Sequence, residues 1–379
     1  MSGAPVVLTA GGTGGHVFPA QALAAELKRR GRDIVLITDV RGAGYEQRFP
    51  DTAIHAVRAG TPSGRGPFGR MMAMGEIAAG TLAARGLLKR LRPAAVVGFG
   101  GYPSLPAMLA ATRLRLPTLL HEQNAILGRV NRLLAPRVAA IATSFADTAG
   151  IGGADLAKIT VTGNPVRDAI AAVREVPYTA PQTNGPFRLL VLGGSQGARI
   201  LSEVVPAALI QLPPEIRTRI RLTQQCRPED LARVGTIYQE SGIAADLAAF
   251  VEDVPALLAS THLCIARAGA STVAEIALAG RPVVLVPYAA AMDDHQTANA
   301  KTLVTAGGAW LMPEAKFTPG ALRQTLDTLL QDSATLGEMA GSARGAGRPD
   351  AAAALADVVA RLAPADGAAA NDDNGRAAA

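Results

Sequence analysis

A histidine ends a glycine-rich turn near the start of the chain, in Gly11-Gly12-Thr13-Gly14-Gly15-His16. The turn follows an apolar run at residues 6–10 and precedes a helix-like segment. A strand that turns through glycines into a helix leaves backbone N–H groups at the positive end of the helix dipole, where phosphate binds well. The same dipole favours the neutral imidazole, which can accept a proton near neutral pH. The turn therefore predicts an anion site in which His16 acts as a general base, caps the helix or binds a diphosphate.

A second turn of the same kind opens the other half of the chain. It reads Gly193-Gly194-Ser195-Gln196-Gly197-Ala198 and follows the apolar residues 189–192. Neither turn carries the Lys and Ser/Thr of a P-loop, and neither completes the G-x-G-x-x-G fingerprint of dinucleotide-binding proteins. Asp39, at the end of an apolar run, keeps a dehydrogenase as an alternative, and glycines that only permit close packing are another. The pair of turns favours two nucleotide-binding-type domains.

Strand-like and helix-like segments alternate along both halves. A length of 379 residues, 49% of them hydrophobic and 4% aromatic, favours two domains built on parallel sheets that helices cover. The predicted fold is α/β, with two doubly wound Rossmann-like domains. We expect domains at 1–165 and 166–349, a helix at 350–363 that packs back on the first domain, and a disordered tail at 364–379. The stretch 178–186 reads as the interdomain linker, with a hinge at 163–165. In the second half we expect, among other strands, one at 248–251.

The composition also bears on the compartment. Cys226 and Cys264 are too few and too far apart for a disulfide framework or a metal cluster, so we expect reduced core thiols in a cytoplasmic protein. The sequence shows no secretory signal. Its longest uncharged run, at 93–112, is interrupted by glycines and prolines and reads as strand, turn and helix instead of a membrane span.

The formal charge of +6 is concentrated between residues 61 and 92. Glu76 is the only acidic residue in that segment, against six basic residues: Arg65, Arg70, Arg85, Lys89, Arg90 and Arg92. The segment also carries apolar side chains such as Phe68 and Met72, spaced as on one side of a long helix. This pattern predicts a surface that rests on anionic lipid, with a core helix that has a solvated basic end as the alternative. Nucleic acid is not expected, because the segment is poor in aromatic residues for base stacking and no nucleic-acid-binding motif occurs.

Several motifs, taken in order along the chain, resemble those of the MurG family of bacterial peptidoglycan glycosyltransferases. They are the two glycine turns, His121-Glu122-Gln123-Asn124, Gly163-Asn164-Pro165-Val166-Arg167 and Arg267-Ala268-Gly269-Ala270-Ser271-Thr272-Val273-Ala274-Glu275. The resemblance implies a GT-B fold, with two Rossmann-like domains facing a cleft. It also implies inverting transfer of N-acetylglucosamine from UDP-GlcNAc to the 4-hydroxyl of undecaprenyl-diphospho-N-acetylmuramoyl-pentapeptide. We further expect peripheral attachment to the cytoplasmic face of the inner membrane and contacts with cell-wall synthesis and division proteins.

For the donor, the resemblance assigns Glu275 to the ribose hydroxyls of UDP, although an ordinary exposed helix glutamate is the alternative. A carboxylate can accept two hydrogen bonds from a cis-diol. No cofactor is implied, and the chain contains no D-x-D triplet to hold a metal ion against the diphosphate. The other residues implied to bind the donor are Ser195 and Gln196 of the second turn, Val251 at the uracil, the turn Ala270, Ser271 and Thr272 at the diphosphate, and Gln296 at the sugar hydroxyls. Ser195 has a helix N-cap as its alternative role.

For the acceptor, inverting transfer needs a base that takes the proton of the 4-hydroxyl, and we expect His16 in that role, with Glu122 in reserve. The acceptor diphosphate is expected at Thr13, Gly14 and Gly15, together with a third glycine turn at 98–104. Asn124 is expected at the donor sugar, and Arg167 either steadies diphosphate charge or forms a salt bridge between the domains. We expect His121 to be a buried, hydrogen-bonded core histidine. A UDP-GlcNAc 2-epimerase, another GT-B transferase and a non-catalytic binding protein remain alternatives.

Overall fold

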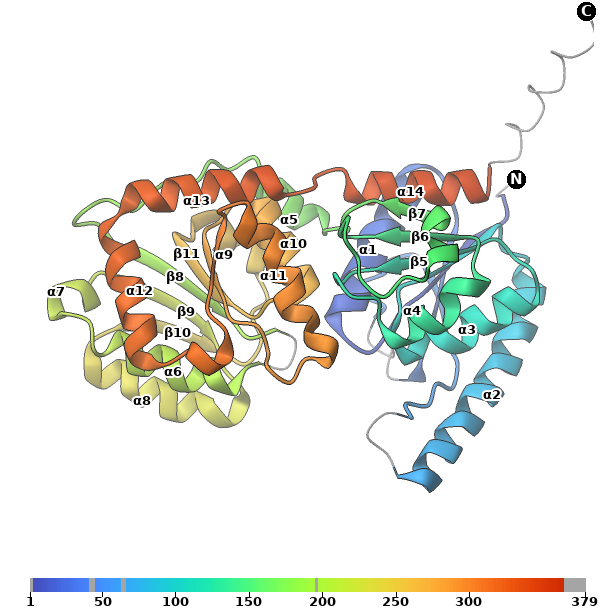
Figure 1. The fold of residues 1–379 in the computed structure, drawn as a ribbon, viewed down its shortest axis with the longest axis horizontal. Coiled ribbons are helices and arrows are strands. Elements are labelled where there is room, and N and C mark those ends of the chain that lie inside the picture. The colour runs from blue at the N-terminus through green and yellow to red at the C-terminus, as the bar shows by residue number, and fades with distance from the viewer. Residues whose placement is uncertain (1–2, 41–44, 63–65, 195–196, 365–379) are drawn as a thin grey trace, which may run out of the picture. The chain divides into compact units, whose positions relative to one another are not determined.

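Figure 1 shows the computed structural model of the chain, which describes residues 3–40, 45–62, 66–194 and 197–364. Contacts within the chain divide it into two compact units. The first runs from the N-terminal residues to Pro165 and resumes at Asp350, and the second comprises Val166–Pro349. The chain thus leaves the first unit once and returns to it through its last helix.

The first unit is built on a seven-stranded parallel sheet, in the order β3-β2-β1-β4-β5-β6-β7. Four adjacent strands, β2, β1, β4 and β5, are buried along their whole length, as parallel strands covered on both faces are. The strands are β1 (Val6–Thr9), β2 (Ile34–Thr38), β3 (Ala53–Ala56), β4 (Ala95–Gly98), β5 (Thr118–Glu122), β6 (Ala140–Thr143) and β7 (Ile159–Val161).

Helices cover both faces of this sheet (Figure 1). One hydrophobic cluster joins α1 and α14 to the sheet, and the other joins α2, α3 and α4 to it. The bounds are α1 (Gly14–Arg29), α2 (Pro67–Leu91), α3 (Gly101–Arg113), α4 (Arg129–Leu134), α14 (Ala351–Leu362) and the 3-10 helices η2 (Ala135–Arg137) and η3 (Gly153–Lys158). Helix α14 packs against α1, where Leu355 and Val359 are buried beside Leu23, and Arg30 forms an ion pair with Asp357 at 2.5 Å.

The second unit repeats this plan. Its six-stranded parallel sheet has the order β10-β9-β8-β11-β12-β13, so strands of the same rank along the chain are neighbours in both sheets. The strands are β8 (Phe187–Leu192), β9 (Ile220–Gln225), β10 (Ala244–Ala248), β11 (Leu263–Ala266), β12 (Val283–Leu285) and β13 (Ala309–Leu311). This is the strand order of dinucleotide-binding Rossmann folds. The prediction of two doubly wound α/β domains is confirmed.

One core of the second sheet includes α6, α8, α12 and part of α13, and the other includes α5, α9, α10 and α11. The bounds are α5 (Asp168–Val173), α6 (Arg199–Leu209), α7 (Pro214–Arg217), η4 (Pro228–Asp230), α8 (Leu231–Ser241), α9 (Val254–Ser260), α10 (Ala270–Ala279), η5 (Met292–Asp294), α11 (His295–Thr305), η6 (Glu314–Lys316), α12 (Pro319–Gln331) and α13 (Ser333–Ala346).

Two local predictions were wrong. The edge strand lies at β10 (Ala244–Ala248) and not at 248–251, because an edge strand exposes its residues and need not contain an apolar run. The stretch 178–186 is not the linker, since it belongs to the second unit. The Tyr178 hydroxyl there donates to the His262 carbonyl at 2.9 Å, and its ring lies beside the buried guanidinium of Arg281.

Candidate active site

The first glycine turn lies where the first sheet reverses its strand order. β1 and β4 are neighbours there, but the helices that follow them, α1 and α3, pack on opposite faces of the sheet. In such sheets ligands bind beyond the carboxyl ends of the two strands. Gly100 and Gly101 adopt φ of 81° and 72°, a region that favours glycine, and a Cβ atom on Gly101 would lie 3.2 Å from His16 Nε2. The start of α3 therefore approaches His16 closely because residue 101 has no side chain.

Helix α1 begins with uncapped backbone donors. Thr13 is its N-cap residue, but the Thr13 side chain makes no capping hydrogen bond. The Thr13 carbonyl accepts from the backbone N–H groups of His16 and Val17 at 3.1 and 3.2 Å. Gly14 and Gly15 form the first turn, where the helix dipole favours an anion. The structure thus gathers Thr13, Gly14, Gly15 and His16 at one helix start.

His16 is linked to two polar residues at the end of β5. Its Nδ1 lies 3.1 Å from Gln123 Oε1, and Gln123 Nε2 lies 3.0 Å from His121 Nδ1. His121 Nε2 in turn lies 3.2 Å from the Gly163 carbonyl. Burial lowers the pKa of His121 from 6.5 to about 4, because its charged form would lose water, with a smaller lowering by the nearby His16. His121 is the buried, hydrogen-bonded histidine that its position suggested.

Glu122 is buried, and its carboxylate accepts hydrogen bonds from the loop that follows β5. Its Oε1 accepts from the backbone N–H and the side-chain amide of Asn124 at 3.0 and 3.1 Å. Its Oε2 accepts from the Gly128 N–H at 2.8 Å and from the Asn131 amide at 2.9 Å. Four donors therefore fix the carboxylate in place, an arrangement that suits positioning of the loop better than proton transfer.

The second glycine turn lies at the corresponding place in the second sheet, where β8 and β11 are neighbours and α6 and α10 pack on opposite faces. Gln225 of β9 braces the turn, because its Oε1 accepts from the Gly193 N–H at 3.1 Å and its amide donates to the Gly194 carbonyl at 2.8 Å. Ser195 and Gln196, both expected to bind the donor, lie outside the described residues.

Helix α10 offers an uncapped start beside a buried carboxylate. Its N-cap residue is Gly269, no side chain caps it, and Ala270, Ser271 and Thr272 form the first turn. Ser271 Oγ is buried without a hydrogen-bond partner among the described residues. A buried hydroxyl costs free energy unless it is paired, so its position suits a hydrogen bond to a ligand.

Glu275 lies one turn further along α10. Its carboxylate is paired with Arg167 at 3.0 Å, and its side chain is 13% exposed. Burial raises the pKa of Glu275, and the charge and hydrogen bond of Arg167 oppose that rise. Both residues belong to the second unit, so this ion pair is not a bridge between the two units.

The other residues expected to bind the donor lie near loops at the carboxyl edge of the second sheet. Gln296 Oε1 accepts from the Tyr288 backbone N–H at 2.9 Å, and the buried Val251 follows β10. Arg267, to which the motif alone gave no role, donates to Glu314 at 3.1 Å and lies 5.2 Å from the Tyr288 ring centroid. Its signal in the sequence was its place directly before the turn that opens α10.

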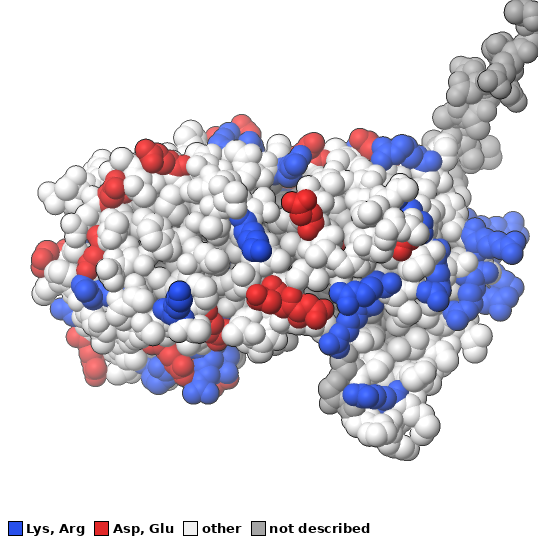
Figure 2. All heavy atoms as spheres, viewed as in Figure 1, with Lys and Arg blue, Asp and Glu red and all other residues white. Residues whose placement is uncertain are grey.

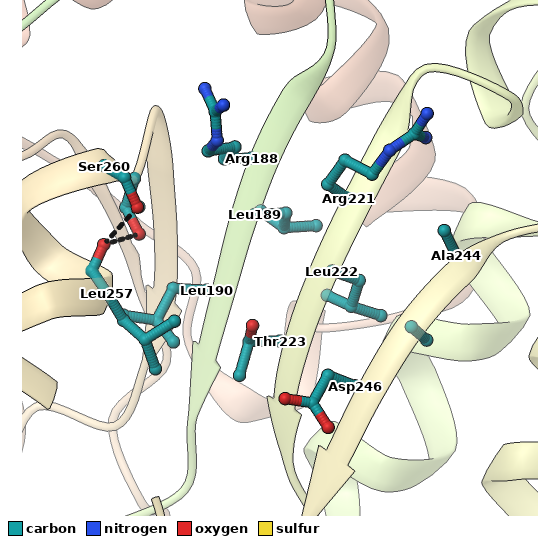
Figure 3. A pocket seen from close by; sticks show the side chains of 12 residues that line it. Arg188, Leu189, Leu190, Arg221, Leu222, Thr223, Ala244, Asp246, Leu257 and Ser260 are labelled. Atoms are coloured by element: carbon teal, nitrogen blue, oxygen red, sulfur yellow. Dashed lines mark hydrogen bonds between the residues drawn. The ribbon is translucent and has the colours of Figure 1, made fainter. Parts of the chain in front are cut away.

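A cavity of about 430 Å³ in the second unit lies elsewhere (Figure 3). It is lined by the amino-terminal halves of β8, β9 and β10, with residues such as Arg188, Arg221 and Asp246, and by Leu257 and Ser260 of α9. Because substrates of parallel sheets bind beyond the carboxyl ends of strands, this cavity is not the candidate site.

Helix α2 carries the basic and apolar segment. Five large apolar residues of the segment are 52–69% exposed: Phe68, Met71, Met72, Met74 and Leu82. Arg85, Lys89, Arg90 and Arg92 are exposed toward its end, whereas Arg65 lies outside the described residues. Figure 2 shows Lys and Arg side chains gathered on the first unit near the end of α2, while much of the helix surface in view is uncharged. None of the described helices, α2 included, combines the length and hydropathy of a membrane span.

Two Rossmann-like units with open helix starts at their switch points, together with two family matches, place the chain among the glycosyltransferases of the GT-B class. Residues 6–143 match the glycosyltransferase family 28 N-terminal domain, and residues 188–355 match the family 28 C-terminal domain. The chain is 52% identical over 359 residues to the UDP-N-acetylglucosamine–N-acetylmuramyl-(pentapeptide) pyrophosphoryl-undecaprenol N-acetylglucosamine transferase of Rhodospirillum centenum, covering 95% of this chain and 94% of that protein.

Solved structures agree with this assignment. The crystal structure of Acinetobacter baumannii MurG superposes with a TM-score of 0.74 at 31% identity, covering 94% of this chain and 99% of that chain. A UDP-GlcNAc 2-epimerase from Neisseria meningitidis reaches a TM-score of 0.66 at 14% identity, covering 94% and 100% of the two chains, and at that identity shows a common fold alone. The chain belongs to glycosyltransferase family 28, and within it to the MurG family. The resemblance inferred from the motifs is confirmed.

Proposed function

We propose that this chain transfers N-acetylglucosamine from UDP-N-acetylglucosamine to the 4-hydroxyl of undecaprenyl-diphospho-N-acetylmuramoyl-pentapeptide, with inversion at the sugar carbon. The observation that carries the proposal is the pair of open helix starts, α1 beside His16 and α10 beside Glu275, each at a switch point of its own sheet. The name of the 52% identical relative contains the same donor sugar and the same lipid-linked acceptor.

In the proposed reaction, His16 Nε2 accepts the proton of the acceptor 4-hydroxyl. The oxygen then forms a bond to the sugar C1 while the bond from C1 to the phosphate oxygen breaks, and UDP leaves with that electron pair. The N-terminus of α1 and the neighbouring start of α3 would hold the acceptor diphosphate. Glu122 and Asn124 would shape the loop beside the sugar.

The second unit would bind the donor. Glu275 would accept hydrogen bonds from the ribose hydroxyls, and Ser271 with the first N–H groups of α10 would bind the diphosphate. Gln296 would bind the sugar hydroxyls, and the main chain at Val251 the uracil. Arg167 would hold the Glu275 carboxylate in place and ionised.

Transfer of labelled N-acetylglucosamine to a short-chain lipid-linked muramoyl-pentapeptide, with EDTA present, tests this proposal. His16→Ala should abolish turnover and leave the affinity for UDP unchanged, and Glu275→Gln should weaken donor binding. Matched controls are His55→Ala in β3 and Glu338→Gln on the exposed side of α13, which should behave as wild type.

The alternatives give different results in the same experiment. Formation of UDP-N-acetylmannosamine from the donor alone would establish an epimerase. Binding of the donor with no product, in wild type and in His16→Ala alike, would establish a binding protein. Either result would refute the proposal.

We also propose that α2 attaches the enzyme to the cytoplasmic face of the inner membrane. An exposed apolar stripe followed by exposed basic residues suits insertion at an anionic lipid surface. The wild-type chain should sediment with vesicles that contain anionic lipid, whereas the double variant Phe68→Ser/Met72→Ser should remain in the supernatant. Leu156→Ser is the matched control, because Leu156 is 58% exposed on the same unit but lies in η3. Equal binding of all three proteins would refute this attachment.

A further inference from the structure

We infer that Gln123 and His121 are positioning residues that hold His16 in the tautomer with its proton on Nδ1, so that Nε2 keeps a free lone pair. The inference deepens the proposed function and rests on it only where catalysis is concerned. It follows from a continuous series of hydrogen bonds that runs from His16 through Gln123 and His121 to the Gly163 carbonyl.

The protons in this series of hydrogen bonds can be assigned by starting from the Gly163 carbonyl. A backbone carbonyl can only accept a hydrogen bond, so His121 Nε2, 3.2 Å from the Gly163 oxygen, must carry a proton. His121 is fully buried and holds a single proton near neutral pH, because burial disfavours its charged form. His121 Nδ1 is therefore unprotonated and can only accept.

The amide of Gln123 is oriented by two acceptors. Its Nε2 lies 3.0 Å from His121 Nδ1 and 3.1 Å from the His121 carbonyl, and an amide nitrogen has one proton for each. The opposite orientation would place the amide oxygen against two acceptors. Gln123 Oε1 must therefore face His16.

His16 completes the series as a donor. Its Nδ1 lies 3.1 Å from Gln123 Oε1, an oxygen that can only accept, so Nδ1 carries the proton. The neutral ring has one N–H, and Nε2 is thereby left as the acceptor. Nε2 is also the nitrogen that faces the start of α3, where a Cβ atom on Gly101 would be 3.2 Å away. A proton acceptor is thus aimed at the region proposed for the acceptor substrate.

Selective ¹⁵N labelling of histidine tests the inference directly, with the His16 signals identified by their loss in His16→Ala. In the wild-type protein near neutral pH we expect protonated Nδ1 and unprotonated Nε2 at His16. A proton on Nε2 would overturn the inference without any variant. Gln123→Met, which keeps the length of the side chain but has no amide, should shift His16 toward the Nε2–H form that isolated histidine prefers. An unchanged tautomer in this variant would also overturn it.

Kinetics then separate this inference from the proposed function. Gln123→Met should lower kcat by about 10- to 100-fold, as losses of supporting hydrogen bonds do, and leave the KM for UDP-N-acetylglucosamine within about twofold. Gln224→Met, at a buried glutamine of the second unit, is the matched control and should alter neither the His16 signals nor kcat. If Gln123→Met moves the proton of His16 but leaves kcat unchanged, the positioning stands and the role of His16 as base is refuted.

Discussion

Substitution by alanine should stabilise the protein at one glycine of α2 and destabilise it at another, because the first faces solvent and the second faces backbone. At Gly75 a Cβ atom would meet nothing within 4 Å. At Gly80 it would lie 1.9 Å from the Arg58 carbonyl oxygen. The segment before α2 also packs closely at Gly60, where a Cβ atom would lie 2.4 Å from the Ala73 carbonyl oxygen.

The magnitudes follow from these distances. Alanine at Gly75 removes the cost of a glycine in a helix interior and should stabilise the first unit by roughly 0.5–1 kcal/mol. Alanine at Gly80 gains the same amount, but α2 and the Arg58 backbone must separate by about 1 Å, since a backbone oxygen has no rotamer to change. Overpacking of this kind costs about 1–3 kcal/mol or more, so we expect a net loss of about 2 kcal/mol.

Calorimetry or urea unfolding of the full chain provides the measurement. A change of about 2 kcal/mol corresponds to roughly 4–8 °C for a unit of this size. The transition of the second unit is the internal control and should not move. If Gly80→Ala were as stable as Gly75→Ala, the close packing of α2 on residues 58–60 would be refuted.

Three further predictions concern the candidate site. Ser271→Ala should change stability by less than about 0.5 kcal/mol, because its hydroxyl has no partner among the described residues, yet raise the Kd for UDP-N-acetylglucosamine by roughly tenfold in calorimetric titration. Arg167→Met should destabilise the second unit by about 2 kcal/mol by leaving Glu275 buried without its cation, and adding Glu275→Gln should restore part of that loss in urea unfolding. Because the folded state lowers the His121 pKa to about 4, the unfolded chain binds more protons between that value and 6.5, and the first unit should lose about 3 kcal/mol of stability as pH falls through this window. In His121→Asn, urea unfolding at the two ends of this pH window should show a smaller loss of stability on acidification than in wild type.

The parts of the fold that sequence predicts well are those set by neighbouring residues. Buried parallel strands such as β1 and β4 are continuous apolar runs, and the turns after β1 and β8 need glycine for their positive φ. β10 gave no such signal, because three of its five residues are exposed at the edge of the sheet. Its position depends on pairing with β9 and not on its own composition.

The parts of the candidate site that sequence did not predict are pairings between distant residues. His16 and Gln123 are 107 positions apart, and Arg167 and Glu275 are 108 apart. His16 and Glu275 could be proposed from their motifs, because each lies on a helix that a glycine-containing turn opens. Gln123 could be named only as part of a motif. Nothing in the neighbouring residues indicates that its amide reaches the first helix of the chain. Pairing of β5 with β4 brings Gln123 near His16. No pattern in the local sequence predicts that the two side chains are close.

The choice of an amide at position 123 has a physical consequence in the proposed mechanism. A carboxylate would also accept a hydrogen bond from His16 Nδ1, but it would add negative charge beside the site proposed for the acceptor diphosphate and would repel it. It would also have no proton to donate to His121, whose unprotonated Nδ1 would then face a second acceptor. The neutral amide donates to one histidine and accepts from the other, so it fixes the orientation of His16 without adding charge to the site. At a position that orients a base next to an anionic substrate, glutamine is therefore more suitable than the aspartate found in serine-protease triads.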